Sequence, residues 1–158
     1  MSDILVAYFS TTGTTAYAAK RLAEATGGDL FEIEPEIPYT QKDLNWMNPF
    51  ARSTREMKGK RPYPEIKNNN ADIENHSVIL LCFPIWWYIA PTIINRFLES
   101  YNFSNKRIVL FATSGGSGFG KILEKLRSSI NGNAELIEGK MLNGNDFAEE
   151  LRTFVNNI

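Results

Sequence analysis

Hydroxyl side chains crowd a short segment near the start of the chain. Residues 10–15 read Ser-Thr-Thr-Gly-Thr-Thr, directly after the apolar run 4–9 and directly before a helical pattern. Ser and Thr supply hydrogen-bond donors, Gly13 lets the backbone turn tightly, and a helix N-terminus adds free N–H groups with a partial positive charge. One hydroxyl would suffice as a helix cap, so five in six residues favour a loop that holds a phosphate without any basic residue.

Three consecutive aromatic residues mark a second loop. Residues 83–91 read Phe-Pro-Ile-Trp-Trp-Tyr-Ile-Ala-Pro and follow another apolar run. A planar aromatic ligand would explain Trp86, Trp87 and Tyr88, because rings stack at a modest cost in entropy. The alternative is packing beneath the long segment 36–75. Neighbouring side chains cannot both point the same way, so we expect one tryptophan at the ligand and the other in packing.

Glycine dominates a third loop, where residues 113–120 read Thr-Ser-Gly-Gly-Ser-Gly-Phe-Gly. Four glycines allow close backbone approach, and their N–H and C=O groups could bind the polar edge of a flat ring. A flexible strand-to-helix turn is the alternative, but it needs only one glycine. No loop matches the ATP or dinucleotide fingerprints, G-x-x-x-x-G-K-[ST] and G-x-G-x-x-G. A phosphate cradle, an aromatic surface and a polar edge together describe FMN.

Strand and helix patterns alternate along the chain and position these loops. Strand patterns occur at 4–9, 30–34, 78–83, 107–112 and 134–138, and the continuous apolar runs at 4–9 and 78–83 are typical of strands buried on both faces. Helical spacing of apolar residues lies between them and after the last one. This alternation predicts a three-layer α/β/α fold with a five-stranded parallel sheet of order 2-1-3-4-5. The three loops follow the first, third and fourth strands, which are neighbours in that order, so they should converge on one ligand.

Segment 36–75 has no clear pattern. Prolines interrupt it, and a short helix is expected from about Pro49 to Lys58. So long an irregular segment in a compact domain is often functional. Five basic residues within 52–61 could bind an acidic partner or the phosphate of a pyridine nucleotide, although a solvated helix face is the commoner explanation.

Length and composition exclude several classes of protein. The 158 residues suit a single domain spanning 1–158, and the net charge of -1 argues against a nucleic-acid binder. We see no signal peptide and no apolar run long enough for a membrane span, so a cytoplasmic location without membrane partners is expected. Cys82 is expected to be a buried thiol and His76 a surface turn residue, which leaves neither a catalytic pair nor a metal site.

The three motifs together resemble the flavodoxins, and more closely a flavodoxin-like group marked by a strand-P-x-W-W element. The phosphate-loop pattern T/S-x-T-G-x-T corresponds to residues 10–15, the second element to 84–87 with Ala90-Pro91, and the third to 113–118. The resemblance implies that the phosphate is held by Ser10, Thr12, Gly13, Thr14 and Thr15. It implies that the isoalloxazine is surrounded by Trp86, Trp87, Ser114, Gly115 and Gly116. From the same two loops we also expect cofactor contacts from Pro84, Ile85, Tyr88, Thr113 and Gly118.

The role implied is electron transfer between redox partner proteins, by a monomer or a homodimer. The alternative is an FMN-dependent NAD(P)H:quinone-type oxidoreductase on the same fold. A phosphoacceptor protein of the same topology would need acidic residues where the first and third strands end, and Phe9-Ser10 and Phe83-Pro84 supply none. Two features depart from the family: many flavodoxins are strongly acidic and dock basic partners, and Tyr88 stands where related sequences often have glycine.

Overall fold

One parallel sheet forms the centre of the molecule. The computed structural model describes residues 3–114, 118–142 and 148–158. All strand pairings are parallel, and the order is β2-β1-β3-β4-β5, as predicted. The strands are β1 (Ile4–Tyr8), β2 (Asp29–Glu32), β3 (Val78–Pro84), β4 (Arg107–Thr113) and β5 (Glu135–Met141).

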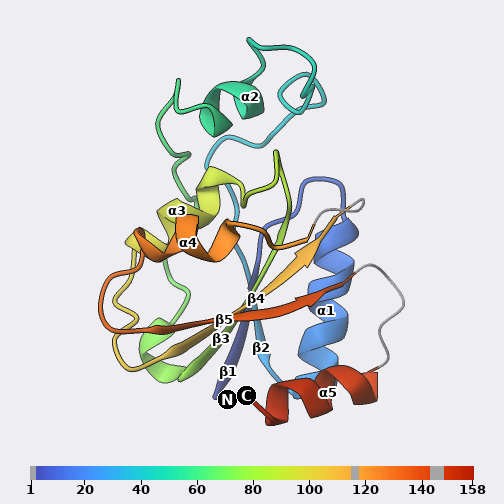
Figure 1. Ribbon diagram of the computed structural model, residues 1–158, viewed down its shortest axis with the longest axis vertical. Helices are drawn as coiled ribbons and strands as arrows, with labels where there is room; N and C mark the ends of the chain where they lie inside the picture. Colours follow the sequence, from blue (N-terminus) through green and yellow to red (C-terminus); the bar gives the residue numbers. More distant parts are fainter. Residues whose placement is uncertain (1–2, 115–117, 143–147) are drawn as a thin grey trace.

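Helices cover both faces of the sheet, which confirms the predicted three layers. In Figure 1, α1 and α5 lie on one side of the sheet and α3 and α4 on the other. The helices are α1 (Thr14–Thr26), α2 (Arg52–Met57), α3 (Thr92–Glu99), α4 (Ile122–Arg127) and α5 (Ala148–Asn156), with a 3₁₀ turn η1 at Ile73–Asn75. None of these helices is long and apolar enough to cross a membrane.

The apolar core is divided by the sheet into two clusters. Successive strand residues point to opposite faces, so β3 sends Leu81 and Phe83 into the cluster beneath α3 and α4, and Leu80 and Cys82 into the cluster beneath α1 and α5. Apart from Arg107 and Thr113 at the ends of β4, strands β3 and β4 are therefore apolar, which is why their positions are readable from sequence. The thiol of Cys82 is buried, as predicted.

A glycine allows the edge strand β5 to bend towards the carboxyl end of β4. The register between β4 and β5 shifts between Leu110 and Ala112. A Cβ at Gly139 would lie 2.2 Å from the carbonyl oxygen of Leu110, so no larger residue fits there. Beyond the shift, the N–H of Leu142 donates to the carbonyl oxygen of Ala112 at 2.7 Å.

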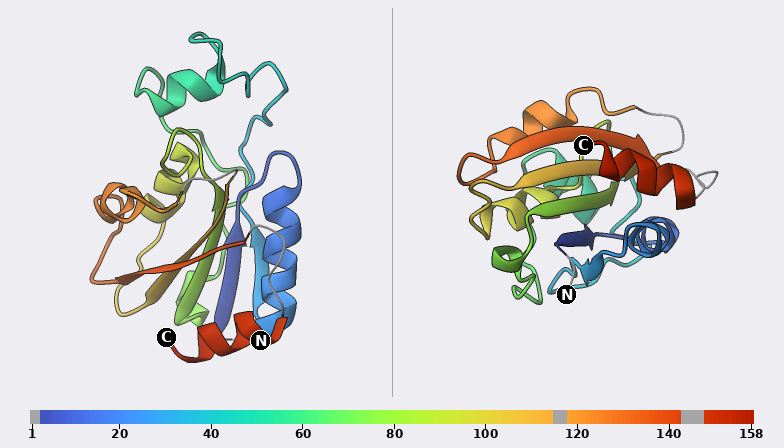
Figure 2. Two further views of the ribbon diagram at one scale, coloured as in Figure 1. Left: turned by 45° about the vertical axis from the view of Figure 1, so that its right-hand side comes forward. Right: turned by 90° about the horizontal axis from the view of Figure 1, so that it is seen from below.

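Residues 36–63, here called the cap, lie beyond the carboxyl ends of the strands (Figures 1 and 2). The two ends of the cap lie side by side, because Pro35 and Ile66 form an antiparallel bridge. The helix of the cap is shorter than predicted and begins at Arg52 rather than Pro49. The side-chain oxygen of Asn48 accepts the N–H of Phe50 at 2.9 Å, and its main-chain oxygen accepts the N–H of Ala51 at 3.1 Å. These two bonds hold a turn where we expected helix.

His76 corrects one sequence-based expectation. Its side chain is buried rather than exposed in a turn. Nδ1 lies 2.8 Å from the carbonyl oxygen of Asp72, and Nε2 lies 2.8 Å from the carboxylate of Asp29 at the start of β2. Both ring nitrogens are partnered, so this histidine ties the amino end of the sheet together.

Candidate functional site

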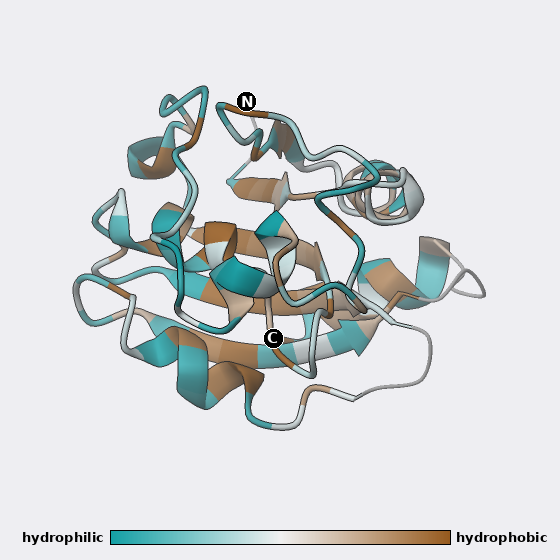
Figure 3. Cartoon of the chain, turned by 90° about the horizontal axis from the view of Figure 1, so that it is seen from above, coloured by the Kyte–Doolittle hydropathy of each residue, from teal (hydrophilic) through white to brown (hydrophobic). Residues whose placement is uncertain are grey.

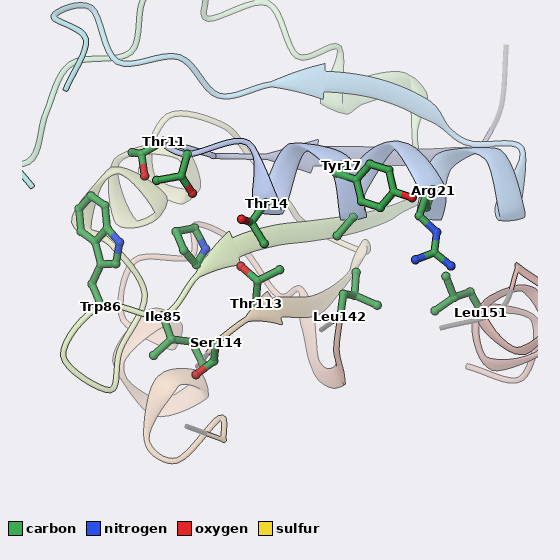
Figure 4. A pocket seen from close by; sticks show the side chains of 13 residues that line it. Thr11, Thr14, Tyr17, Arg21, Ile85, Trp86, Thr113, Ser114, Leu142 and Leu151 are labelled. Carbon is green, nitrogen blue, oxygen red and sulfur yellow. The ribbon is translucent and has the colours of Figure 1, made fainter. Parts of the chain in front are cut away.

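A cavity of about 490 Å³ opens at the carboxyl edge of the sheet, where the three predicted loops meet. Side chains from β1, β3 and β4 ends line it together, as expected for the switch point of an open α/β sheet. Figure 4 shows Trp86 at one end, Arg21 and Leu151 at the other, and Thr14 and Thr113 between them. The lining residues are Thr11, Thr12, Thr14, Tyr17, Ala18, Arg21, Pro84, Ile85, Trp86, Thr113, Ser114, Leu142 and Leu151.

The loop between β1 and α1 presents backbone donors to this cavity. Gly13 precedes α1 with φ 94°, a left-handed conformation that favours glycine, and its N–H donates to Ser10 Oγ at 3.2 Å. The N–H groups of Thr14, Thr15 and Ala16 have no acceptor among the described residues. No acidic side chain occupies the first turn of α1. This helix end therefore has the donors and the dipole that bind an anion.

A buried hydrogen bond links this loop to the end of β4. The hydroxyl oxygens of Thr15 and Thr113 lie 2.8 Å apart, and both residues are buried. The Thr15 side chain is therefore turned towards β4 and does not line the cavity. Thr113, in contrast, both makes this bond and lines the cavity.

The second loop forms a two-residue hairpin turn. The N–H of Trp86 donates to Ile89 at 2.9 Å, and the N–H of Ile89 donates back at 3.0 Å. The two residues between them, Trp87 and Tyr88, have φ of 48° and 68°. Such turns normally use glycine or asparagine at both positions, so this one carries backbone strain beside the candidate site.

The Trp86 ring is fixed by two other aromatic rings. Its centroid lies 5.7 Å from Phe9 and 5.5 Å from Tyr39, both in edge-to-face geometry. Edge-to-face pairs are favourable because the positive ring edge meets the negative ring face. Trp86 therefore keeps one orientation at the border of the cavity.

A second cavity, of about 470 Å³, adjoins the first. It lies between the cap and the hairpin turn and shares Thr11, Thr12, Ile85 and Trp86 with the first cavity. The residues that line only this second cavity are Leu44, Trp46, Ser53, Trp87 and Tyr88. Its described lining holds no charged side chain.

A buried ion pair supports the cap over these cavities. Arg52 Nε donates to Glu56 at 2.9 Å, and both side chains are buried. The guanidinium also donates to the carbonyl oxygen of Ile37 at 2.7 Å and lies 4.0 Å from the centre of the Tyr39 ring. Burial, together with the hydrogen bond from its hydroxyl to Glu56, raises the pKa of Tyr39. Tyr39 thus stays neutral and holds Trp86 from the other side.

The structure brings most predicted site residues to one place, but not all line a cavity. The cavity-lining ones are Thr12, Thr14, Pro84, Ile85, Trp86, Trp87, Tyr88, Thr113 and Ser114. Ser10 and Gly13 shape the first loop, Thr15 binds Thr113, and Gly118 is exposed and lines neither cavity in the described part of the chain. Gly115 and Gly116 lie outside the described residues.

Sequence reasoning missed several lining residues. Tyr17 and Arg21 follow Thr14 by one and two helical turns on the same face of α1, a spacing that could have identified them. Trp46 and Ser53 come from the cap, which gave no periodic signal. Among the described residues, no group of three or more His, Cys, Asp or Glu side chains could hold a metal ion.

The profile of the flavodoxin family, described as Flavodoxin, matches residues 3–158. The chain belongs to the flavodoxin family. Its fold is close to that of a candidate flavoprotein from Bacteroides eggerthii DSM 20697, with 43% identity, a TM-score of 0.88, and coverage of 98% of this chain and 96% of the other. A candidate flavoprotein from Bacteroides uniformis ATCC 8492 is 39% identical, with a TM-score of 0.85 and coverage of 97% of both chains.

A more distant fold neighbour of this flavodoxin-family chain is a flavoprotein from Lactobacillus acidophilus NCFM, whose structure is a complex with FMN. It is 20% identical, with a TM-score of 0.74 and coverage of 96% of this chain and 97% of the other. No curated protein sequence matches the chain. The flavodoxin-like fold predicted from sequence is confirmed by these structures.

Proposed function

We propose that this protein binds FMN in the first cavity and serves in electron transfer. The observation that carries the proposal is the meeting of three strand-end loops around one space of about 490 Å³. The start of α1 gives that space free backbone donors, and Trp86 places a fixed indole ring at one end of it (Figure 4). FMN likewise combines a phosphate with a planar ring.

The phosphate end is assigned to the start of α1. Three consecutive N–H groups, from Thr14, Thr15 and Ala16, lack acceptors among the described residues. The helix dipole adds positive potential there, and hydrogen bonds to a charged group are roughly twice as strong as neutral ones. The Thr12 and Thr14 side chains border the same cavity and could donate as well.

The ring end is assigned to Trp86 and the residues facing it. Ile85 and Trp86 offer apolar surface, and Ser114 offers a polar edge. The Lactobacillus acidophilus flavoprotein, which shares the fold and whose structure is a complex with FMN, supports FMN as the cofactor. When bound, the flavin supplies the redox chemistry. The protein supplies the binding site and the orientation of the ring.

The test is a comparison of FMN with riboflavin, which lacks the phosphate. Each charge-assisted hydrogen bond is worth about 1.5–3 kcal/mol, so losing several should weaken binding by orders of magnitude. Titration of the flavin-free protein, followed by flavin fluorescence, measures both affinities. Inorganic phosphate should compete with FMN and leave riboflavin binding unchanged. Equal affinities for the two flavins would contradict the phosphate assignment.

A second candidate function, an NAD(P)H:quinone-type oxidoreductase, is favoured by the second cavity. That space of about 470 Å³ adjoins the proposed flavin site and is walled by aromatic rings, so it could admit a small substrate. Stopped-flow mixing of the FMN-loaded protein with NADH and with NADPH separates the two functions. Rapid bleaching of the flavin would favour the oxidoreductase, and its absence would favour the electron carrier.

A further inference from the structure

The cap differs in charge from the rest of the molecule. Residues 36–63 contain six basic and three acidic residues, a net charge of +3, whereas the whole chain has a net charge of -1. The remainder therefore carries a net charge of -4. One basic residue of the cap, Arg52, is buried against Glu56, so this pair adds nothing to the surface potential. Arg55, Lys58, Lys60 and Arg61 are exposed.

The cap also holds most of the exposed large apolar side chains. In the described part of the chain eight such side chains are exposed, and five of them, Ile37, Trp46, Met47, Phe50 and Tyr63, belong to the cap. Phe50 is 83% exposed and Met47 is 75% exposed. Another of the eight, Tyr88, lies outside the cap but borders the same cavity as Trp46. Figure 3 looks down on this end of the molecule. Exposed apolar side chains concentrated in one segment, with basic residues among them, are typical of an interaction site.

Contacts at the base of the cap tie it to the body of the molecule. The Arg52–Glu56 pair is buried, Tyr39 packs on Phe9 of the body, and the bridge between Pro35 and Ile66 closes the base of the cap. A preformed surface loses less entropy on binding than a loop that must first fold. These contacts make the cap a preformed surface of the kind that docking favours.

We propose that the cap is the docking surface for an acidic redox protein, an inference that rests on the proposed electron-transfer function. The positive charge of the cap would attract such a protein and orient it, and the exposed apolar residues would hold it. A basic partner would be repelled. A second copy of this chain, docking cap to cap, would place two positive surfaces together. The docked partner would lie beside Trp86 and both cavities, which is where electrons must enter or leave.

Binding of a plant-type [2Fe–2S] ferredoxin, used as an acidic probe, tests the proposal by calorimetry. Replacing Arg55, Lys58 and Lys60 with Gln should weaken binding about tenfold at low ionic strength, because it removes three exposed positive charges from the docking surface. Replacing Lys20, Lys125 and Arg127 with Gln is the matched control, since these residues are exposed on α1 and at α4, away from the cap. The difference between the two triple variants should disappear at about 0.5 M salt.

A separate substitution tests the exposed apolar residues of the cap. Phe50→Ser should weaken ferredoxin binding at both low and high salt, whereas Leu30→Ser, at an exposed residue of β2, should not. Equal losses in the two triple variants would overturn the proposal, as would tighter binding of the basic protein cytochrome c. Self-association that Phe50→Ser abolishes, seen by light scattering, would assign the surface to a second copy instead.

The experiment separates this inference from the proposed function. Ferredoxin binding is measured on the flavin-free and the FMN-loaded protein, and FMN binding is titrated in every variant. The cap variants should bind FMN as the unmodified protein does. Failure to bind FMN would contradict the proposed function, whereas unchanged FMN binding with no ferredoxin binding would contradict the docking surface alone.

Discussion

The hydroxyl oxygens of Thr15 and Thr113 lie 2.8 Å apart, although the residues are 98 positions apart in the chain. Thr15 is in the first turn of α1, beside the candidate phosphate site, and Thr113 ends β4, beside the candidate ring site. This bond thus ties the start of α1 to the carboxyl end of β4 beside the proposed cofactor site. Both side chains are buried, so neither hydroxyl has water to replace its partner.

We predict that Thr15→Val and Thr113→Val each lower the free energy of unfolding by about 1–3 kcal/mol, because each leaves the other hydroxyl buried and unpaired. The double variant should lose little more than either single one, since no unpaired hydroxyl remains. Urea denaturation measures all three. Thr92→Val is the control: the Thr92 hydroxyl is already buried without a partner, so its removal should cost nothing. Additive losses from Thr15→Val and Thr113→Val would show that the two hydroxyls are independent.

The sheet and its loops were predictable because their signals are local. β3 and β4 are apolar on both faces, so each appears as a continuous run, and the loops that follow them are marked by composition. The parallel order then places those loops together without further information. Boundaries differ by a few residues, as at β5, where Gly139 lets the strand continue beyond the predicted end at Glu138.

The cap and His76 were not predictable, because their structure depends on distant partners. The short helix of the cap is held by Arg52, whose guanidinium contacts Glu56, Tyr39 and the carbonyl oxygen of Ile37, and no periodic pattern announces such a cluster. His76 has polar neighbours in sequence and therefore looked exposed. Its burial is tolerated because the carboxylate of Asp29, 47 positions away, and the carbonyl oxygen of Asp72 partner its two ring nitrogens.

Thr14→Glu should abolish FMN binding, because it places a negative charge where the phosphate is proposed to lie. Thr14 is exposed and borders the cavity, so the fold should survive, and an acidic residue in the first turn of a helix is favourable in itself. Quenching of flavin fluorescence on titration measures binding. Thr153→Glu, an equal change on the exposed face of α5, should bind FMN normally. Normal binding by Thr14→Glu would place the phosphate elsewhere.

The thiol of Cys82 should make stability depend on alkaline pH. Burial raises the pKa of this thiol above its ordinary value of 9.0. Above pH 9 the unfolded chain loses this proton while the native protein keeps it, so the free energy of unfolding falls by about 1.4 kcal/mol per pH unit. Cys82→Ala should make that slope shallower between pH 9 and 10, leaving the part that comes from buried tyrosines such as Tyr39. Val109→Ala, which empties space in the same buried cluster, should destabilise the protein but keep the slope. Identical slopes in both variants would rule out the thiol as the cause.

Tyr88 should be replaceable with a gain in stability, despite its place beside the candidate site. Its φ is 68° and its side chain is 77% exposed, so it is strained and makes few contacts. Left-handed backbone costs a residue with a Cβ about 1–2 kcal/mol, and glycine avoids that cost. Tyr88→Gly should therefore raise the free energy of unfolding by about 1 kcal/mol in urea denaturation. Tyr63→Gly is the same change at an exposed tyrosine without positive φ, and it should lower stability instead. If both variants were destabilised equally, the hairpin turn at Trp87 and Tyr88 would not be strained in solution.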